Sequence, residues 1–170
     1  VPSDEDVLLL LSPDRTGEVL SWLEKYTIME DCVYENISAS VGQCSVYQIT
    51  GDIRLGSAAV PDAGCSAVVV MGETTVRLLH HRSVTGAGLR LLFSTEDTEA
   101  VQGFLTGDAA LPAVGLEAAT LWRIDRLLPS VGHELSQLAN PLEAGAAEAV
   151  DFEKGCYIGQ EVIARLDSYD

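Results

Sequence analysis

A cysteine near the end of the chain is the residue best placed to do chemistry. Cys156 stands in residues 151–161, which read DFEKGCYIGQE, between Gly155 and Gly159. Such a loop can present a thiol beside the start of a helix, where free N–H groups and the helix dipole favour an anion. Lys154 adds positive charge two residues away. The pattern therefore makes Cys156 a candidate thiolate, able to act as a nucleophile or a metal ligand.

The residues after the loop predict a short amphipathic helix. A polar pair, Gln160 and Glu161, precedes apolar residues that recur at helical spacing, namely Val162, Ile163 and Leu166. The same residues also fit a structural role, in which Cys156 is a small buried side chain and the glycines serve turn geometry. No second cysteine completes a CxxC pair with it. Composition and spacing alone favour that structural role.

The string of residues 154–161, KGCYIGQE, resembles the K-G-C-Y-x-G-Q-E signature of the YgfZ family. These proteins are folate-binding relatives of the glycine-cleavage T-protein, an aminomethyltransferase. Residues 140–145 and 149–152 resemble the segment that precedes this signature, and residues 121–125 sit where the family has an R-[IL]-E helix. The resemblance is strong over residues 115–168 and rests on pattern only elsewhere.

The resemblance implies a function and a cofactor. A YgfZ-like protein would bind tetrahydrofolate and support the assembly or repair of iron–sulfur enzymes, and the family is also linked to tRNA modification. Iron–sulfur client proteins would then be partners, and Cys156 would be the catalytic residue. Whether the chain is an enzyme, with one-carbon or aminomethyl transfer activity, is left open.

Four residues are implied to bind folate: Arg123, Asp125, Glu143 and Lys154. Asp125 matches a glutamate that hydrogen-bonds the pterin ring in aminomethyltransferases, and a carboxylate suits the paired donors of that ring. Arg123 would help orient the pterin, although charges on such a helix face are usually solvated. Glu143 would line the pocket or cap the next helix. Lys154 would attract the glutamate tail of folate as a point charge, or be a surface lysine.

The remaining signature residues are interpreted as support for the loop: Gly155, Tyr157, Gly159, Gln160 and Glu161. Gln160 and Glu161 are expected to hold the loop by hydrogen bonds. Glu161 also stands four residues before Arg165, a spacing that predicts an ion pair along the helix.

Two other classes of function stay open. One is an aminomethyltransferase of glycine cleavage, and the other is a non-catalytic interaction module that keeps the fold without folate. Against the first, residues 83–90 lack the tyrosine and glutamate that face folate in the matching T-protein segment, and the T-protein lacks the cysteine found here as Cys156. These departures favour the YgfZ branch.

Composition limits the classes of partner that the chain can bind and indicates its cellular compartment. The chain has 26 acidic and 10 basic residues, a net charge of −16, which repels phosphate backbones and makes nucleic-acid binding unlikely. No apolar stretch is long enough for a membrane span. Four cysteines without zinc spacing or secreted-scaffold density predict a reducing cytoplasm. His80, His81 and His133 have no Asp or Cys at ligand spacing, so no metal site is predicted.

An α+β fold must position these residues. Residues 1–50 are predicted to form a partial ferredoxin-like β-α-β-β unit, with strands at 6–11, 32–37 and 45–50 around a helix ending near Tyr26. Residues 51–170 are predicted to be the folate-binding α+β domain, with an antiparallel sheet and helices. The chain lacks an initial methionine and stops where family members continue, so a fragment of the three-domain folate-binding ring is expected.

Within the second domain, residues 67–71 and 75–80 predict a hairpin across Gly72 and Glu73, and residues 89–93 a third strand. A helix over residues 116–128 would end before Pro129 and carry Arg123 and Asp125. Its predicted inner stripe consists of Leu121, Ile124 and Leu128.

Overall fold

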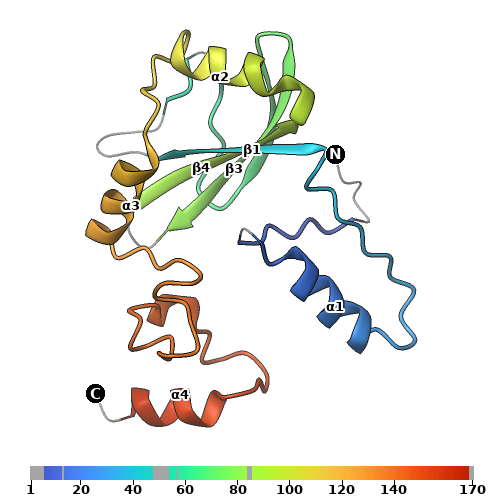
Figure 1. The fold of residues 1–170 in the computed structure, drawn as a ribbon, viewed down its shortest axis with the longest axis vertical. Helices are drawn as coiled ribbons and strands as arrows, with labels where there is room; N and C mark the ends of the chain where they lie inside the picture. The colour runs from blue at the N-terminus through green and yellow to red at the C-terminus, as the bar shows by residue number, and fades with distance from the viewer. Residues whose placement is uncertain (1–5, 13, 48–53, 57, 84–85, 169–170) are drawn as a thin grey trace. The chain divides into compact units, whose positions relative to one another are not determined.

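The computed structural model describes residues 6–12, 14–47, 54–56, 58–83 and 86–168 (Figure 1). The chain divides into two compact units, Val1–Ala39 and Ser40–Asp170. The boundary predicted after Thr50 falls within residues 48–53, which lie outside the described residues. The predicted α+β class is confirmed, because a four-stranded antiparallel sheet is combined with four α-helices in the described residues.

The first unit contains helix α1 (Thr16–Tyr26), which ends where the sequence predicted. The strands predicted at residues 6–11 and 32–37 were wrong, because both stretches are irregular and expose apolar side chains such as Val7 and Val33. An apolar run becomes a strand only where a neighbour completes its backbone hydrogen bonds. The partial ferredoxin-like unit is therefore not formed by the described part of residues 6–47.

The sheet of the second unit has the strand order β1-β4-β3-β2, with all pairs antiparallel. Its strands are β1 (Val41–Tyr47), β2 (Ser66–Met71), β3 (Thr74–Ser83) and β4 (Gly86–Ser94). The β2–β3 hairpin turns at Gly72, whose φ of 63° glycine adopts without strain. The third strand predicted for the ferredoxin-like unit appears instead as β1, which pairs with β4. A strand from the predicted first domain thus belongs to the sheet of the second.

One face of the sheet carries the hydrophobic core. Alternate residues of β3 and β4 point to it, among them Leu78, Leu89 and Leu91, which are fully buried. The short helix η1 (Thr95–Asp97) leads into α2 (Thr98–Thr106), whose Val101 and Leu105 close the same core. The loop before β2 adds the fully buried Leu55. The core is therefore built from residues 55–105, before the signature segment begins.

Helix α3 (Leu116–Asp125) ends earlier than predicted and presents a different face inward. Leu121 and Ile124 of the predicted inner stripe are 62% and 52% exposed, so that prediction was wrong. The indole of Trp122 packs on Tyr47 of β1 instead, with ring centroids 4.6 Å apart. Figure 1 shows α3 beside the sheet at the end of β1 that carries Tyr47. Burial of the larger aromatic surface fits this orientation.

Residues 126–168 run through turns to the last helix. They include the short helix η2 (Ala147–Ala149) and the predicted helix α4 (Gln160–Asp167), which begins at the expected residue. On α4 Ile163 is buried, whereas Val162 and Leu166 of the predicted apolar stripe are exposed.

Candidate functional site

The Cys156 loop, defined as residues 151–159, is held by hydrogen bonds within itself and to α4. The Asp151 carboxylate accepts from the N–H groups of Glu153 and Lys154 through one oxygen, Oδ1, at 2.9 and 3.1 Å. The Gln160 side chain accepts from the N–H of Tyr157 through Oε1 at 3.1 Å. These bonds fix the backbone on both sides of Cys156.

The two glycines of the loop have different physical requirements. Gly159 has a φ of 90° immediately before α4, a conformation that a side chain would strain. Gly155 has a φ outside the left-handed region, and a Cβ placed there would meet no atom within 4 Å. Turn geometry therefore explains why a glycine is required at position 159, and it gives no such requirement at position 155.

The thiol of Cys156 is exposed. The loop does not place it in the first turn of a helix, because α4 begins at Gln160, and the helix dipole acts mainly within that turn. The prediction that the dipole of the following helix favours an anionic Cys156 was therefore wrong. The ammonium of Lys154 lies 4.7 Å from the ring centroid of Tyr157, a cation–π contact. The loop therefore exposes the Cys156 thiol to solvent, and Lys154, two residues earlier in the sequence, supplies one positive charge.

Glu161 makes no ion pair with Arg165 among the described residues, so the predicted helical pair is corrected. Both side chains are exposed on α4. Exposed pairs of long side chains gain little free energy from fixing their rotamers, which agrees with this outcome.

Arg123 ties the end of α3 to the chain that follows. Its Nη1 donates to the Glu134 carboxylate at 2.7 Å and to the carbonyl of Leu128 at 3.0 Å, and its side chain is 18% exposed. Glu134 also accepts from the N–H of Ser130 at 3.1 Å. The backbone N–H groups of Ser130 and Glu134, and then the Arg123 guanidinium, lower the pKa of the Glu134 carboxyl. Sequence reasoning missed Glu134, whose one signal was its position in a turn-rich stretch after α3.

Asp125 is open to solvent. Its side chain is 81% exposed, and Oδ2 lies 3.8 Å from Nε of Arg126, a loose contact that leaves the carboxylate free to accept other donors. Trp122 stands three residues earlier on the same helix, so both residues lie toward one side of α3.

Glu143 closes a local turn. Its carboxylate accepts from the N–H of Asn140 at 2.9 Å, while the Asn140 side chain accepts from the N–H groups of Leu142 and Glu143 at 3.0 Å. This reciprocal arrangement is that of a capping box, here closing a turn and not an α-helix. The alternative predicted for Glu143 was a cap of the next helix, whereas in the structure its carboxylate closes a turn.

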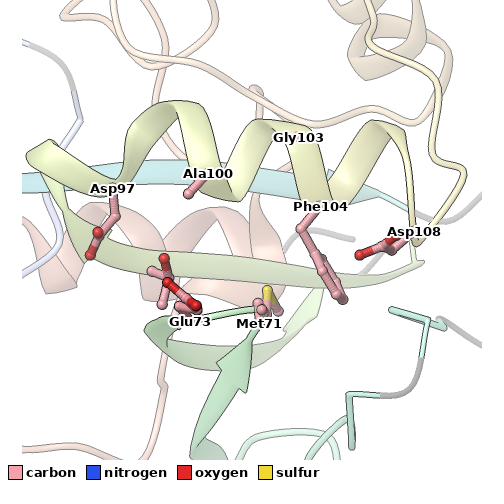
Figure 2. A pocket seen from close by; sticks show the side chains of 9 residues that line it. Met71, Glu73, Asp97, Ala100, Gly103, Phe104 and Asp108 are labelled. Atoms are coloured by element: carbon pink, nitrogen blue, oxygen red, sulfur yellow. The ribbon is translucent and has the colours of Figure 1, made fainter.

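Within the described ranges, no hydrogen bond or ion pair joins Cys156 to Arg123, Asp125 or Glu143. Each of these groups has local partners or faces solvent. A hollow lies elsewhere, between the β2–β3 turn and α2 (Figure 2). Phe104 of α2 points into it toward Met71, and Glu73, Asp97 and Asp108 surround it. It contains none of the predicted site residues.

Among the described residues, no cluster of three His, Cys, Asp or Glu side chains could hold a metal ion. None of the described helices has the length and apolar character needed to cross a membrane.

The structure combines an α+β fold with an exposed cysteine in a KGCYIGQE loop, and the sequence of the chain is similar to those of several known proteins. Over 95% of its length the chain is 30% identical to an aminomethyltransferase of Geobacillus kaustophilus. It is 28% identical, over 96% of its length, to a chloroplastic protein of Arabidopsis thaliana named as a putative transferase. A shorter match, 38% identical over 58% of the chain, is to an aminomethyltransferase of Symbiobacterium thermophilum.

The chain spans less than half of these relatives, 47% of the Geobacillus protein and 39% of the Arabidopsis one. No family model matches it. The relatives therefore support kinship with aminomethyltransferases and related transferases, and do not single out the YgfZ branch.

Proposed function

We propose that this chain is part of a tetrahydrofolate-binding protein related to aminomethyltransferases, in which Cys156 is the reactive group. The observation that carries the proposal is the exposure of the Cys156 thiol on a loop that Asp151, Gln160 and Gly159 fix by local geometry. A fixed backbone around an accessible thiol suits a nucleophile better than a packing residue. Similarity to aminomethyltransferases along nearly the whole chain supports folate as the ligand.

We further propose a YgfZ-like role in supporting the assembly or repair of iron–sulfur enzymes, together with the link to tRNA modification that the resemblance implies. Its support is the KGCYIGQE string and the cysteine within it. In a disulfide exchange, the Cys156 thiolate would attack one sulfur of a client disulfide, and the other sulfur would leave as a thiolate. Acceptance of a one-carbon unit from folate is the other reaction open to the same sulfur.

Asp125 has the role of pterin acceptor in this proposal, because its carboxylate is exposed and weakly paired. Arg123, already bonded to Glu134 and Leu128, would position the end of α3 beside Asp125. Lys154 would meet an anionic part of the ligand as a point charge, and Glu143 would maintain the turn before the Cys156 loop.

Calorimetric titration with tetrahydrofolate tests the ligand. Asp125→Ala is expected to weaken binding by about tenfold or more, since it removes a charge-assisted hydrogen bond. Asp62→Asn, which changes an exposed carboxylate in the loop before β2, is the matched control and should bind as the parent does. If the parent protein binds no folate, the proposal is overturned and a non-catalytic interaction module becomes the better description.

Complementation in cells lacking the protein tests the thiol. Cys156→Ala should bind tetrahydrofolate normally and fail to restore iron–sulfur enzyme activity, whereas Cys65→Ala, also at an exposed cysteine, should restore it. Full restoration by Cys156→Ala would exclude a reactive role for that sulfur.

The names of the relatives favour a second candidate, aminomethyl transfer in glycine cleavage. A direct assay of methylene transfer to tetrahydrofolate distinguishes aminomethyl transfer from the YgfZ-like role. Transfer activity that survives Cys156→Ala would support this candidate, and absence of transfer by a protein that binds folate would support the first.

We also propose that the protein is located in the cytoplasm. The cysteine pattern predicts the cytoplasm, and the Arabidopsis relative carries the word chloroplastic in its name. Imaging of a tagged full-length protein decides between these compartments.

A further inference from the structure

Strand β2 forms one edge of the sheet and exposes apolar side chains there. In the described part of the chain, β3 is its sole neighbour in the sheet. Val68 and Val70 are 51% and 67% exposed, although valine is usually buried. Residues 63–72 contain no charged side chain and no proline, the residues by which natural proteins prevent an edge strand from pairing. Within the described residues, the edge of β2 is therefore open to a further strand.

The backbone groups of β2 alternate between β3 and the free edge. The N–H of His80 on β3 donates to the carbonyl of Cys65 at 3.0 Å, so Cys65 directs its backbone groups toward β3. Because this direction alternates along an antiparallel strand, Val69 also faces β3, whereas Val68 and Val70 direct their N–H and C=O groups outward. The two exposed valines thus present both their side chains and the backbone groups that β3 does not use.

We propose that two copies of the chain pair through β2, antiparallel and about a two-fold axis at Val69. In this register Val68 of each copy stands opposite Val70 of the other, and these outward-facing residues form the hydrogen-bonded pairs. The four valines then lie together on one face, where pairs of β-branched side chains stabilise a sheet. The two four-stranded sheets become one continuous sheet.

Charge and strand direction favour a second copy as the occupant of this edge. The chain has a net charge of −16, so most of its surface repels another copy, but residues 63–72 are uncharged. Antiparallel pairing also places the two Glu73 carboxylates at opposite ends of the interface, because Glu73 follows β2 on each copy. The register is self-complementary, so each outward backbone group of one valine finds its partner on the other copy.

Sedimentation velocity of the full-length protein over a range of concentrations tests this pairing. A single pair of strands is a small interface, so the dimer should form reversibly as the concentration rises. Val70→Lys should raise the Kd of the dimer by about tenfold or more, because a lysine on an edge strand opposes pairing. Gln43→Lys, at an exposed position of β1 on the opposite edge of the sheet, is the matched control and should leave the Kd unchanged.

Hydrogen exchange of single amides locates the interface. The amides of Val68 and Val70 should become protected by about tenfold or more as the dimer forms, because they then donate to the second copy. The amide of Val69 already faces β3 and should change little. Val70→Thr keeps a β-branched side chain and should retain the dimer, which distinguishes loss of pairing in Val70→Lys from loss of folding.

Three outcomes would overturn the proposal. One is a protein that stays monomeric at the highest soluble concentration. Another is a dimer that Val70→Lys leaves unchanged, since its interface would then lie elsewhere. The third is strong protection of the Val68 and Val70 amides in a monomer, which would show that another segment of the full-length protein pairs with β2.

Discussion

The sheet and the Cys156 loop are stabilised by different forces. Residues of β3 and β4 such as Leu78 and Leu91 are fully buried and joined by cross-strand ladders. The Cys156 loop is exposed and depends on a few local hydrogen bonds and one left-handed glycine. Cooperative packing secures the first region, whereas short-range polar contacts shape the second.

This difference separates stability from chemistry. Substitutions in the loop should change ligand handling or reactivity while the sheet stays folded, because few buried contacts are lost. Substitutions in the sheet should lower the stability of the whole second unit.

Truncation of the core should be the most damaging change. Leu91→Ala removes a fully buried side chain and is expected to lower the free energy of unfolding by about 2–5 kcal/mol. Val162→Ala, at an exposed position on α4, should change it by less than about 0.5 kcal/mol. Urea denaturation measures both, and equal losses would contradict the division.

The two glycines of the loop should respond differently to alanine. Gly159→Ala places a Cβ on a residue with a φ of 90°, and should cost about 1–2 kcal/mol of local stability. Gly155→Ala has open space and no such φ, so its cost should stay below about 0.5 kcal/mol of loop stability. Hydrogen exchange of the α4 amides gives the comparison, and a larger effect at Gly155 would refute the backbone argument.

The Arg123–Glu134 contact should make stability depend on pH. Because the pKa of Glu134 is lowered in the folded protein, its contribution is present above the ordinary glutamate value of 4.5 and is lost as pH falls through the lowered pKa. Glu134→Gln should therefore lower Tm modestly at neutral pH, with the difference from the parent shrinking in acid. If the Tm difference between the variant and the parent grew in acid, the predicted direction of the pH dependence would be wrong.

The smallest expected difference is in the rates at which the cysteines are alkylated. Burial raises the pKa of the Cys44 thiol, so less of it is thiolate at neutral pH, whereas Cys156 is exposed. Iodoacetamide should alkylate Cys156 several-fold faster than Cys44, with the exposed Cys32 and Cys65 as references. Peptide mass spectrometry over time measures the order, and preferential labelling of Cys44 would contradict the burial argument.

Local patterns predicted the elements whose signals lie within a few residues. The β2–β3 hairpin at Gly72, the start of α4 at Gln160 and the α+β class all followed from turn residues and apolar spacing. The same reasoning failed at residues 6–11 and 32–37, since an apolar run does not specify whether a partner strand will lie beside it. It also chose the wrong face of α3, because periodicity does not show that Trp122 packs on Tyr47.

The sequence by itself determined a candidate nucleophile, Cys156, and the glycine and glutamine that shape its loop, because those interactions join residues close along the chain. Only the tertiary structure decided that Arg123 pairs with Glu134 and that Arg77 and Arg90 stand on adjacent strands. These neighbours are separated in sequence, and strand register or loop closure brings them together. No local pattern carries that information, because it depends on the packing of the whole unit.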